Sequence, residues 1–288
     1  MSETLPIYKI LDFKQKDPSA HFYANDLKLH LKEHQFTNLP HKHDFYLTVL
    51  FTVGGGTHEI DFTKHSVKPG SLFVLKPGQM HSWNLSSNTR GYVFFHSKNF
   101  YEERSTNEKL KRYPFFASFS NTALFRLSGQ RLRDLKNYMT EIVKEFKEPK
   151  LLADQKIHAL VDLIYIELTR AYAPAQNIKN EGYLNQVQKF EDLVELHYKT
   201  LKYPHEYASK LNISEKHLNR ITRFCVNKTS SQLIAERVTL EAKRLLLGSK
   251  LNVTQIAYEL GFNESSYFIR FFKKQEGVTP LAFNKKYS

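Results

Sequence analysis

The 288-residue sequence predicts an α+β protein, with a β-sandwich or β-barrel in its N-terminal part and helices in the remainder. Residues from about Tyr8 to Phe119 are rich in β-branched and aromatic side chains and are interrupted by turn signals. From about Ser128 the apolar side chains recur at helical spacing. The C-terminal part contains an internal repeat of helical units. Together these observations predict a β part, then a helical segment, then a helical repeat.

The N-terminal part is predicted to consist of short strands joined by tight turns, the pattern of a sandwich or barrel. The strand-like runs are Phe45–Val53, His58–Phe62 and Ser71–Leu75. The turn signals are Gly54-Gly55-Gly56, Pro69-Gly70 and Pro77-Gly78.

Two amphipathic helices are predicted after the β part. Their apolar stripes comprise Leu132, Leu135, Met139, Ile142, Val143 and Phe146, and then Leu152, Ile157, Leu160, Leu163, Ile164 and Leu168. Pro149 ends the first helix. Packing against the barrel alone would need narrower stripes, so a dimer interface is favoured. The polar segment Ala173–Gly182 carries Pro and Gly and is predicted to be a linker.

The repeat consists of two predicted helix-turn-helix units, Tyr207–Thr229 and Ile256–Thr279. Small residues allow close helix approach, and residues tolerant of positive φ allow the sharp turns and the helix ends. In the order first unit and second unit, the small residues are Ala208 and Ala257, the turn residues Asn212 and Gly261, the N-caps Ser214 and Asn263, and the terminators Asn227 and Gly277.

The second helix of each unit is the candidate recognition helix. Its polar face carries Lys216, Asn219, Arg220 and Arg223 in the first unit, and Ser265, Ser266, Arg270, Lys273 and Lys274 in the second. Arg can pair with guanine and Asn with adenine, whereas Lys and Ser suit phosphates. The first unit is therefore expected to read bases and the second mainly to hold the backbone. Ile213, Leu218, Ile221 and Phe224 are expected to cover the apolar side of the first.

A long helix from about Ser230 to Leu247 is predicted between the two units. Its length of about 27 Å approaches the roughly 34 Å between successive major grooves on one side of a duplex. The net charge of +13 also favours a polyanionic partner, and residues 183–288 hold 17 Lys and Arg against 10 Asp and Glu. The spacing and the charge both suit two helices in neighbouring grooves.

The sequence predicts a cytoplasmic protein with no membrane partner. It has a single cysteine, Cys225, which excludes an intramolecular disulfide and is expected to be a small core residue. No apolar run approaches the length of a transmembrane helix, and no signal peptide is evident at the N-terminus.

The segment Glu241–Phe283 closely resembles the signature of AraC/XylS-type transcription regulators, and Asn212–Arg220 resembles that family's first recognition helix. The resemblance implies a bipartite, seven-helix DNA-binding domain. The family's base-reading positions fall on Lys216, Asn219, Arg220, Ser265, Ser266 and Arg270. Two departures are Asn227, where the family usually has Gly, and Asn284, where an Arg often contacts phosphate.

The N-terminal segment resembles the cupin-like sensor domain common in that family, through His41, His43 and the run Pro77–His81. Cupin enzymes add a Glu to hold a metal, but Phe45–Thr48 occupies that stretch. A metal-free barrel without a cofactor is therefore predicted. An effector pocket is expected from His41, His43, Tyr46, Gln79, His81 and Trp83. The alternative is that these histidines only satisfy backbone groups at the barrel mouth.

The predicted parts are a cupin-like effector-sensing domain (1–120), a helical dimerisation segment with the linker (121–182) and a double helix-turn-helix domain (183–288). The predicted function is sequence-specific transcription regulation by a homodimer, without enzymatic activity. The expected partners are promoter DNA and a small effector, with a sugar as a candidate because Trp83 could stack on it, and RNA polymerase as a further candidate. The alternatives are a metal-dependent cupin enzyme with a DNA-binding tail and a protein-binding helical scaffold.

Overall fold

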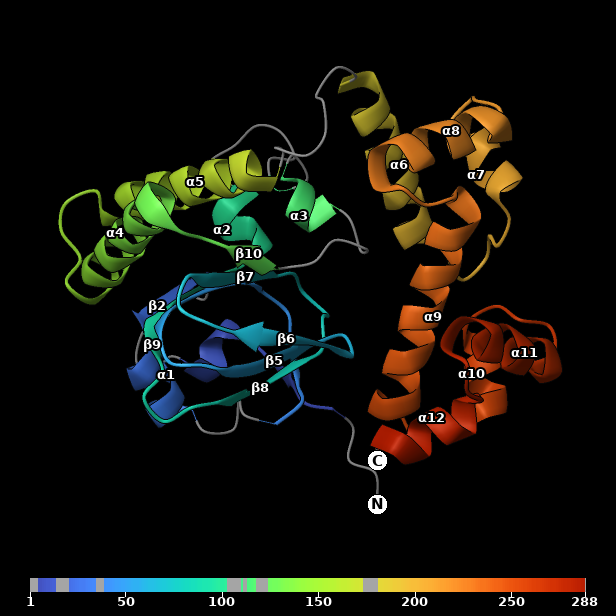
Figure 1. Cartoon of the computed structure of the whole chain (residues 1–288), viewed down its shortest axis with the longest axis horizontal. Helices are drawn as coiled ribbons and strands as arrows, with labels where there is room; N and C mark the ends of the chain where they lie inside the picture. The colour runs from blue at the N-terminus through green and yellow to red at the C-terminus, as the bar shows by residue number, and fades with distance from the viewer. Residues whose placement is uncertain are drawn as a thin grey trace. The chain divides into compact units, whose positions relative to one another are not determined.

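The computed structural model describes residues 5–13, 21–34, 39–102, 110, 113–117, 124–172 and 181–287. They form two compact units, which we describe separately (Figure 1). The β unit draws its described residues from Pro6–Phe116 and Asn121–Ala175, and the helical unit mainly from Gln176–Ser288. The predicted α+β fold, with a β domain ahead of a helical domain, is confirmed.

The β unit contains three sheets and the helices that cover them. Its elements are β1 (Ile7–Tyr8), η1 (Ile10–Phe13), β2 (Phe22–Asp26), α1 (Leu27–Glu33), β3 (Lys42–His43), β4 (Tyr46–Val53), β5 (Gly56–Ile60), β6 (Thr63–Val67), β7 (Ser71–Leu75), β8 (His81–Leu85), β9 (Arg90–His96), α2 (Lys98–Glu102), α3 (Pro114–Ala117), β10 (Leu124–Arg126), α4 (Gly129–Lys147) and α5 (Ala153–Tyr172). The sheet orders are β10-β7-β4-β9-β2 and β6-β5-β8, both antiparallel, and the parallel pair β1-β3.

Alternation along β4 separates the two cores of this unit. Leu47, Val49 and Phe51 pack into the barrel interior, whereas Leu50 packs on the other face with residues of α4 and α5. Thr48 also points to that outer face, since its Oγ1 lies 3.4 Å from the Tyr165 hydroxyl of α5. Successive strand residues face opposite sides of a sheet, so residues on β4 divide by parity between the barrel and the helices.

Two strand predictions have the expected bounds within one residue, and one is shifted. The run Ser71–Leu75 is β7, and β4 begins one residue after the predicted start. The third strand is Gly56–Ile60 instead of His58–Phe62. Asp61 and Phe62 have φ angles of 44° and 71° and form the turn to β6, which a continuing strand does not permit.

The helix α4 lies where its apolar stripe predicted it, and α5 contains the second stripe except Leu152. Leu152 precedes α5 with a φ of 64° and is 60% exposed, so it is not part of the buried stripe. In α5, Leu163 and Ile166 are 42% and 39% exposed, so the helix retains apolar side chains outside the core. Most of the predicted linker, residues 173–180, lies outside the described residues. Glu181 and Gly182 instead begin the next helix.

The described residues 181–287 form seven helices, the number implied by the family resemblance. They are α6 (Glu181–His197), α7 (Pro204–Lys210), α8 (Glu215–Val226), α9 (Ser230–Gly248), α10 (Val253–Glu259), α11 (Ser265–Glu276) and α12 (Pro280–Tyr287). Figure 1 shows α9 running from the α6–α8 group to the α10–α12 group. Across the described residues, no helix combines the length and apolar character needed to span a membrane.

Candidate nucleic-acid interface

The first helix-turn-helix unit, α7 and α8, is built on the predicted residues. Ala208 is buried between the helices, and its carbonyl accepts a hydrogen bond from the Ile213 N–H at 3.0 Å. Asn212 has a φ of 54°, the left-handed conformation that the turn requires. Ser214 caps α8, its hydroxyl accepting from the His217 N–H at 3.1 Å. Asn227 ends the helix with a φ of 53°.

The second unit, α10 and α11, repeats this plan with one change. Ala257 is buried, and Gly261 and Gly277 both have a φ of 75° as predicted. The predicted N-cap Asn263 is wrong, because Glu264 occupies the cap position and makes no side-chain cap bond. The Glu264 carbonyl accepts from the Phe268 N–H, so α11 begins one residue later than predicted.

The buried side of α8 differs from the prediction at one position. Leu218, Ile221 and Cys225 are buried, but Phe224 is 57% exposed. Its ring lies 5.7 Å from the Tyr183 ring of α6 in an edge-on arrangement. Cys225 takes the core position next to it, as a small buried residue.

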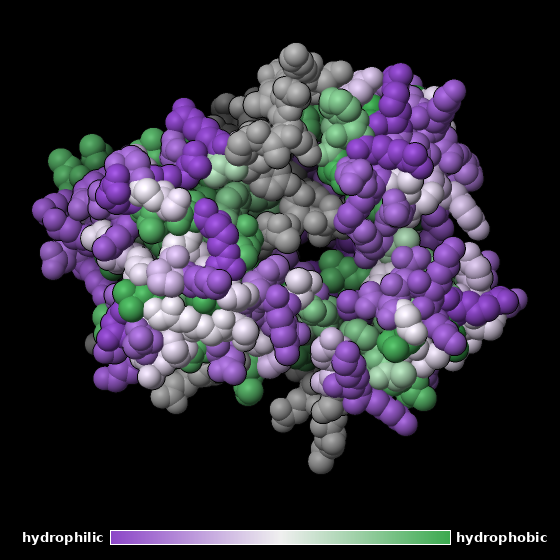
Figure 2. All heavy atoms as spheres, in the orientation of Figure 1, coloured by the Kyte–Doolittle hydropathy of each residue, from purple (hydrophilic) through white to green (hydrophobic). Residues whose placement is uncertain are grey.

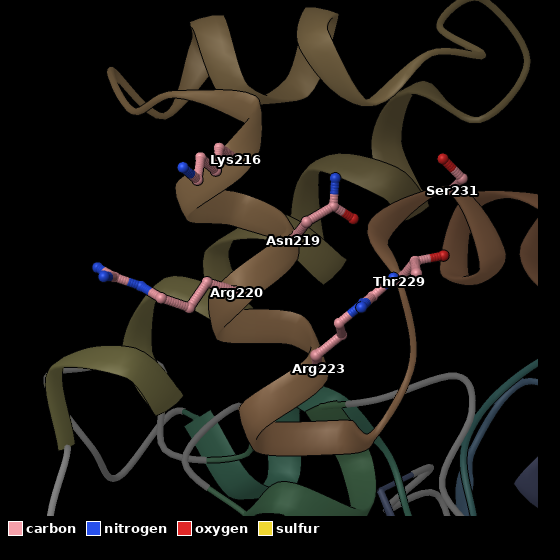
Figure 3. Close-up of a pocket in the computed structure, with 6 residues that line it drawn as sticks. All are labelled: Lys216, Asn219, Arg220, Arg223, Thr229 and Ser231. Carbon is pink, nitrogen blue, oxygen red and sulfur yellow. The ribbon is translucent and has the colours of Figure 1, made fainter.

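The exposed face of α8 borders a groove of about 440 Å³, lined by Lys216, Asn219, Arg220, Arg223, Thr229 and Ser231 (Figure 3). All four residues predicted for this helix therefore line one groove. Asn219 and Arg223 extend toward Thr229 at the start of α9, whereas Arg220 extends to the opposite side. Figure 2 shows that hydrophilic side chains predominate on the visible face of the helical unit.

Asn219 is partly engaged within the chain. Its Oδ1 accepts hydrogen bonds from the Ser230 N–H at 3.1 Å and the Ser230 hydroxyl at 2.9 Å. This side chain thus satisfies a backbone donor in the first turn of α9. Bidentate pairing with adenine needs the same oxygen as well as the amide N–H donors, so only the donors are open in this arrangement.

Arg220 is held by residues that sequence reasoning did not single out. Its Nη2 donates to His217 Nδ1 at 2.7 Å, and its guanidinium carbon lies 5.7 Å from the centre of the Tyr183 ring. Because Nδ1 is an acceptor, the proton of His217 is on Nε2, which donates to Gln186 Oε1 at 3.0 Å. Tyr183 and Gln186 lie on α6, too far along the chain for any local spacing to have indicated them.

On α11, the five predicted residues lie on one helix with mostly exposed side chains. Ser266 donates to Glu264 Oε2 at 3.2 Å, and Ser265 is half-buried. Within residues 181–287, no ion pair involves Arg270, Lys273 or Lys274. Asn284, the second departure from the family pattern, donates to the Leu246 carbonyl on α9 at 2.6 Å, so it fastens α12 to α9.

The six residues expected to line the effector pocket do not all meet. His41, His43, His81 and Trp83 gather inside the barrel, where the rings of His41 and His81 lie 4.2 Å apart. Tyr46 lies on the outer face of β4, stacked on His96 at 5.2 Å. Its even position on the strand, opposite in parity to Leu47, explains this. Gln79 lies in a turn outside the cluster, where it donates to Asp61.

Sequence reasoning missed His58, which completes the cluster. Its Nε2 lies 3.1 Å from His81 Nδ1, and it is fully buried on β5. Burial lowers the pKa of His43 to about 3 and holds the pKa values of His58 and His81 well below their usual range, so these imidazoles are neutral. Only the alternation of β5, with His58 and Ile60 both inward, could have indicated it.

Both readings of these histidines find support. The Nδ1 atoms of His41 and His43 each lie 2.7 Å from a backbone carbonyl, as the structural reading expects. Within this cluster four buried atoms nevertheless have no hydrogen-bond partner, namely His43 Nε2, His58 Nδ1, His81 Nε2 and Trp83 Nε1. The part of the chain that the structure describes contains no group of three His, Cys, Asp or Glu arranged to hold a metal ion.

Comparison with known families identifies both parts of the chain. Residues 207–286 match the family described as helix-turn-helix domain, and residues 29–98 match the AraC-like ligand binding domain. Among solved structures, ToxT from Vibrio cholerae has 16% identity and a TM-score of 0.45, covering 92% of this chain and 98% of that one. The C-terminal domain of the response regulator yesN from Fusobacterium nucleatum has 24% identity and a TM-score of 0.33, covering 35% of this chain and 98% of that one.

Relatives in sequence extend over both domains. The HTH-type transcriptional activator RhaR of Cronobacter sakazakii is 23% identical over 256 residues, which are 86% of this chain and 87% of that protein. The HTH-type transcriptional regulator YfiF of Bacillus subtilis is 25% identical over 263 residues, 88% of this chain and 80% of that protein. With a ligand-binding domain followed by a helix-turn-helix domain that binds DNA, this chain belongs to the AraC-type family of transcription regulators.

Proposed function

We propose that the protein is a dimeric regulator that binds a specific promoter sequence and responds to a small effector in its barrel. The observation that carries the DNA-binding part is the pair of exposed polar helices at the two ends of α9. This helix has 19 residues and is about 28 Å long, close to the roughly 34 Å between major grooves on one side of a duplex. Two recognition helices connected by a helix of this length can enter neighbouring grooves.

The two recognition helices have different proposed tasks. In α8, Arg220 and the open amide donors of Asn219 contact base edges, while Lys216 and Arg223 contact phosphates. In α11, Arg270 and Ser266 contact bases, and Lys273 and Lys274 neutralise the backbone. The groove beside α8 supports this assignment, because it opens between these side chains and the first turn of α9.

The test is selection of duplexes from a randomised pool with the full chain, followed by titration of the selected site and of random DNA at physiological salt. The selected site should bind at least about a thousandfold more tightly than random DNA. Affinity for both should fall steeply as salt rises, because phosphate contacts release counterions. Equal affinity for the two duplexes would refute the proposal.

We propose that the effector lies against Trp83 and the buried histidines. The unpartnered atoms there include the indole N–H, which is a donor. In the hydrogen bond between His58 and His81 one neutral ring donates and the other accepts. Of their two unpartnered nitrogens, one is therefore an acceptor and the other a donor. Neutral donors and acceptors side by side suit hydroxyl groups, and the indole face suits the apolar side of a sugar. Trp83 also lines an open groove of about 400 Å³ beside Lys28 and Lys32, which offers access.

Trp83 is the single tryptophan of the chain, so its fluorescence reports on this site alone. Titration with a panel of sugars and polyols should change its emission in a saturable way for the effector. His81→Gln should weaken that response, whereas His21→Gln, at the exposed turn residue before β2, should leave it unchanged. A response that survives His81→Gln at full strength would place the effector elsewhere.

We propose that residues 121–182 mediate dimerisation, between a sensing part (1–120) and a DNA-binding part (183–288). The exposed apolar side chains Leu163 and Ile166 of α5 support this assignment. Sedimentation of the wild-type chain should give a dimer, and the double variant Leu163→Glu, Ile166→Lys should give a monomer. A matched change on the polar side of α4, Lys136→Glu, should leave the dimer intact.

A further inference from the structure

Arg220 is connected to a helix that was not part of the predicted reading face. One contact joins α6 directly to Arg220, because the Tyr183 ring lies beside its guanidinium. Two more contacts join α6 to His217, namely the Tyr183 ring beside it and Gln186 bound to it. His217 in turn accepts from Arg220 at 2.7 Å. All of these groups lie within the helical unit.

The arrangement restrains Arg220 without using up its capacity to read a base. A free arginine side chain has many rotamers, and fixing it on binding costs entropy. Here an aromatic face and one acceptor select the direction of the guanidinium before DNA arrives. A guanidinium has five N–H donors, of which His217 takes one, so a pair remains for a guanine edge.

We propose that Tyr183 and Gln186, in the first two turns of α6, are positioning residues that set the base preference of Arg220. The proposal rests on the proposed function and adds α6 to the reading site. Phe224 fits the same arrangement, because its exposed ring lies edge-on to the Tyr183 ring at 5.7 Å. This contact gives a role to the exposed Phe224 on the recognition helix, because it supports the Tyr183 ring that lies beside Arg220.

The orientation of His217 makes Gln186 specific in its chemistry. Gln186 must present an oxygen to the Nε2–H of His217, so that Nδ1 remains free to accept from Arg220. A carboxylate at this position can accept in the same way, but an aliphatic side chain cannot. The pair Gln186→Glu and Gln186→Leu therefore separates the hydrogen bond from mere packing.

The experiment measures full-length variants on the duplex selected by the wild-type chain, on the same duplex with each base pair replaced in turn, and on random DNA. Tyr183→Leu should weaken the selected site roughly three- to tenfold and flatten discrimination at one base pair, the one at which Arg220→Ala also loses discrimination. Tyr183→Phe and Gln186→Glu should stay within about twofold of wild type. Gln186→Leu should behave like Tyr183→Leu, and affinity for random DNA should not change.

A double-mutant cycle gives a readout that a purely structural role would not move. In the Arg220→Ala background, Tyr183→Leu should have no further effect on discrimination at that base pair. Thermal unfolding of each variant checks that the helical unit is intact.

Independent effects of the two substitutions, or tighter binding by Tyr183→Leu, would overturn the inference. Tighter binding would mean that α6 withholds Arg220 from DNA. If the wild-type chain itself fails to distinguish the selected site from random DNA, the proposed function fails instead, so the two failures are distinguishable.

Discussion

The two helix-turn-helix units share one plan but are held in place differently. In the first, the left-handed turn residue is Asn212, which is exposed and accommodates a side chain. In the second it is Gly261, where an added Cβ would lie 1.8 Å from the Lys199 carbonyl. The second turn is therefore pressed against the loop that follows α6. The second unit is thus held by this loop as well as by its connection through α9.

The loop after α6 makes further contacts with the second unit. Lys199 forms an ion pair with Glu259 at the end of α10, and the Lys202 ammonium lies 5.5 Å from the centre of the Phe262 ring. Burial lowers the pKa of Lys202 to about 8, although its ammonium donates to the carbonyls of Tyr198 and Lys199. The loop after α6 thus leads into the first unit and also packs against the second unit.

The recognition helices differ in the other direction, because the DNA-facing side chains of the first unit are more restrained than those of the second. In α8, Asn219 and Arg220 are hydrogen-bonded to neighbouring side chains or backbone, whereas Arg270, Lys273 and Lys274 of α11 form no ion pair among the residues described. Preorganised side chains suit base recognition, and mobile ammonium groups suit phosphates. The second unit, which packs against the loop after α6, therefore carries the recognition helix whose basic side chains are less restrained.

The largest difference is expected at the turns. Gly261→Ala should lower the free energy of unfolding by about 3 kcal/mol, since it combines left-handed strain with displacement of a backbone carbonyl. Asn212→Ala, the matched change, should cost about 1 kcal/mol because only the strain applies. Unfolding of the full chain in urea, monitored with a probe placed in the helical unit, measures the loss of unfolding free energy in both variants. Equal costs would mean that the second turn is not seated on the loop.

At the reading faces, Arg220→Ala should cost about 1–3 kcal/mol at the selected duplex and relax preference at one base pair. The expected reason is loss of a bidentate contact to guanine. Titrations against the single-base-pair variants of that duplex give both quantities. A uniform loss across all duplexes would reassign Arg220 to phosphate contact and remove the proposed contrast with α11.

The two helix ends offer a smaller comparison. Gly277→Ala should lower the free energy of unfolding by about 1 kcal/mol through left-handed strain alone, because an added Cβ meets nothing within 4 Å. Asn227→Gly should instead stabilise by about 0.5 kcal/mol, since Asn already pays part of that strain. Thermal unfolding of the two variants should move in opposite directions, and a shift in the same direction would contradict this account.

The smallest effect is expected from Lys273→Ala. It should weaken selected and random duplexes alike by less than about 1 kcal/mol and reduce the slope of log affinity against log salt by about 1. Lys250→Ala, on the loop before α10, is the control and should leave the slope unchanged. A change in base preference with Lys273→Ala would show that the second unit also reads sequence at this position.

Much of the fold follows from local signals. Ala208, Ala257, Asn212 and Gly261 were predictable because a sharp helix-turn-helix crossing demands small residues and positive φ at fixed positions. The apolar periods predicted α4, α5 and α9 for the same kind of reason. The N-cap of α11 was missed because Asn263 and Glu264 compete for adjacent places, and cap propensity alone does not decide between them.

The site was less predictable, because its decisive contacts join residues that are distant in sequence. Strand parity would have placed Tyr46 outside the barrel and His58 inside, but parity requires knowing which residue of each strand faces inward. The exposure of Phe224 and the role of Tyr183 follow only from the packing of α6 on α8. Spacing along α8 grouped Lys216, Asn219, Arg220 and Arg223, but it gave no indication that Asn219 also binds the start of α9.

The continuous helix α9 has a consequence for how such a protein can change its target. Each residue added to or removed from α9 moves the second unit by only about 1.5 Å, but it also turns that unit by about 100° around the helix axis. Gly261 of the second unit lies directly against the Lys199 carbonyl, and a turn of about 100° would break that contact. Inserting or deleting a single residue in α9 is therefore not expected to change the distance between the two contacted DNA segments gradually. A new distance requires changes both in α9 and in the loop that contains Lys199.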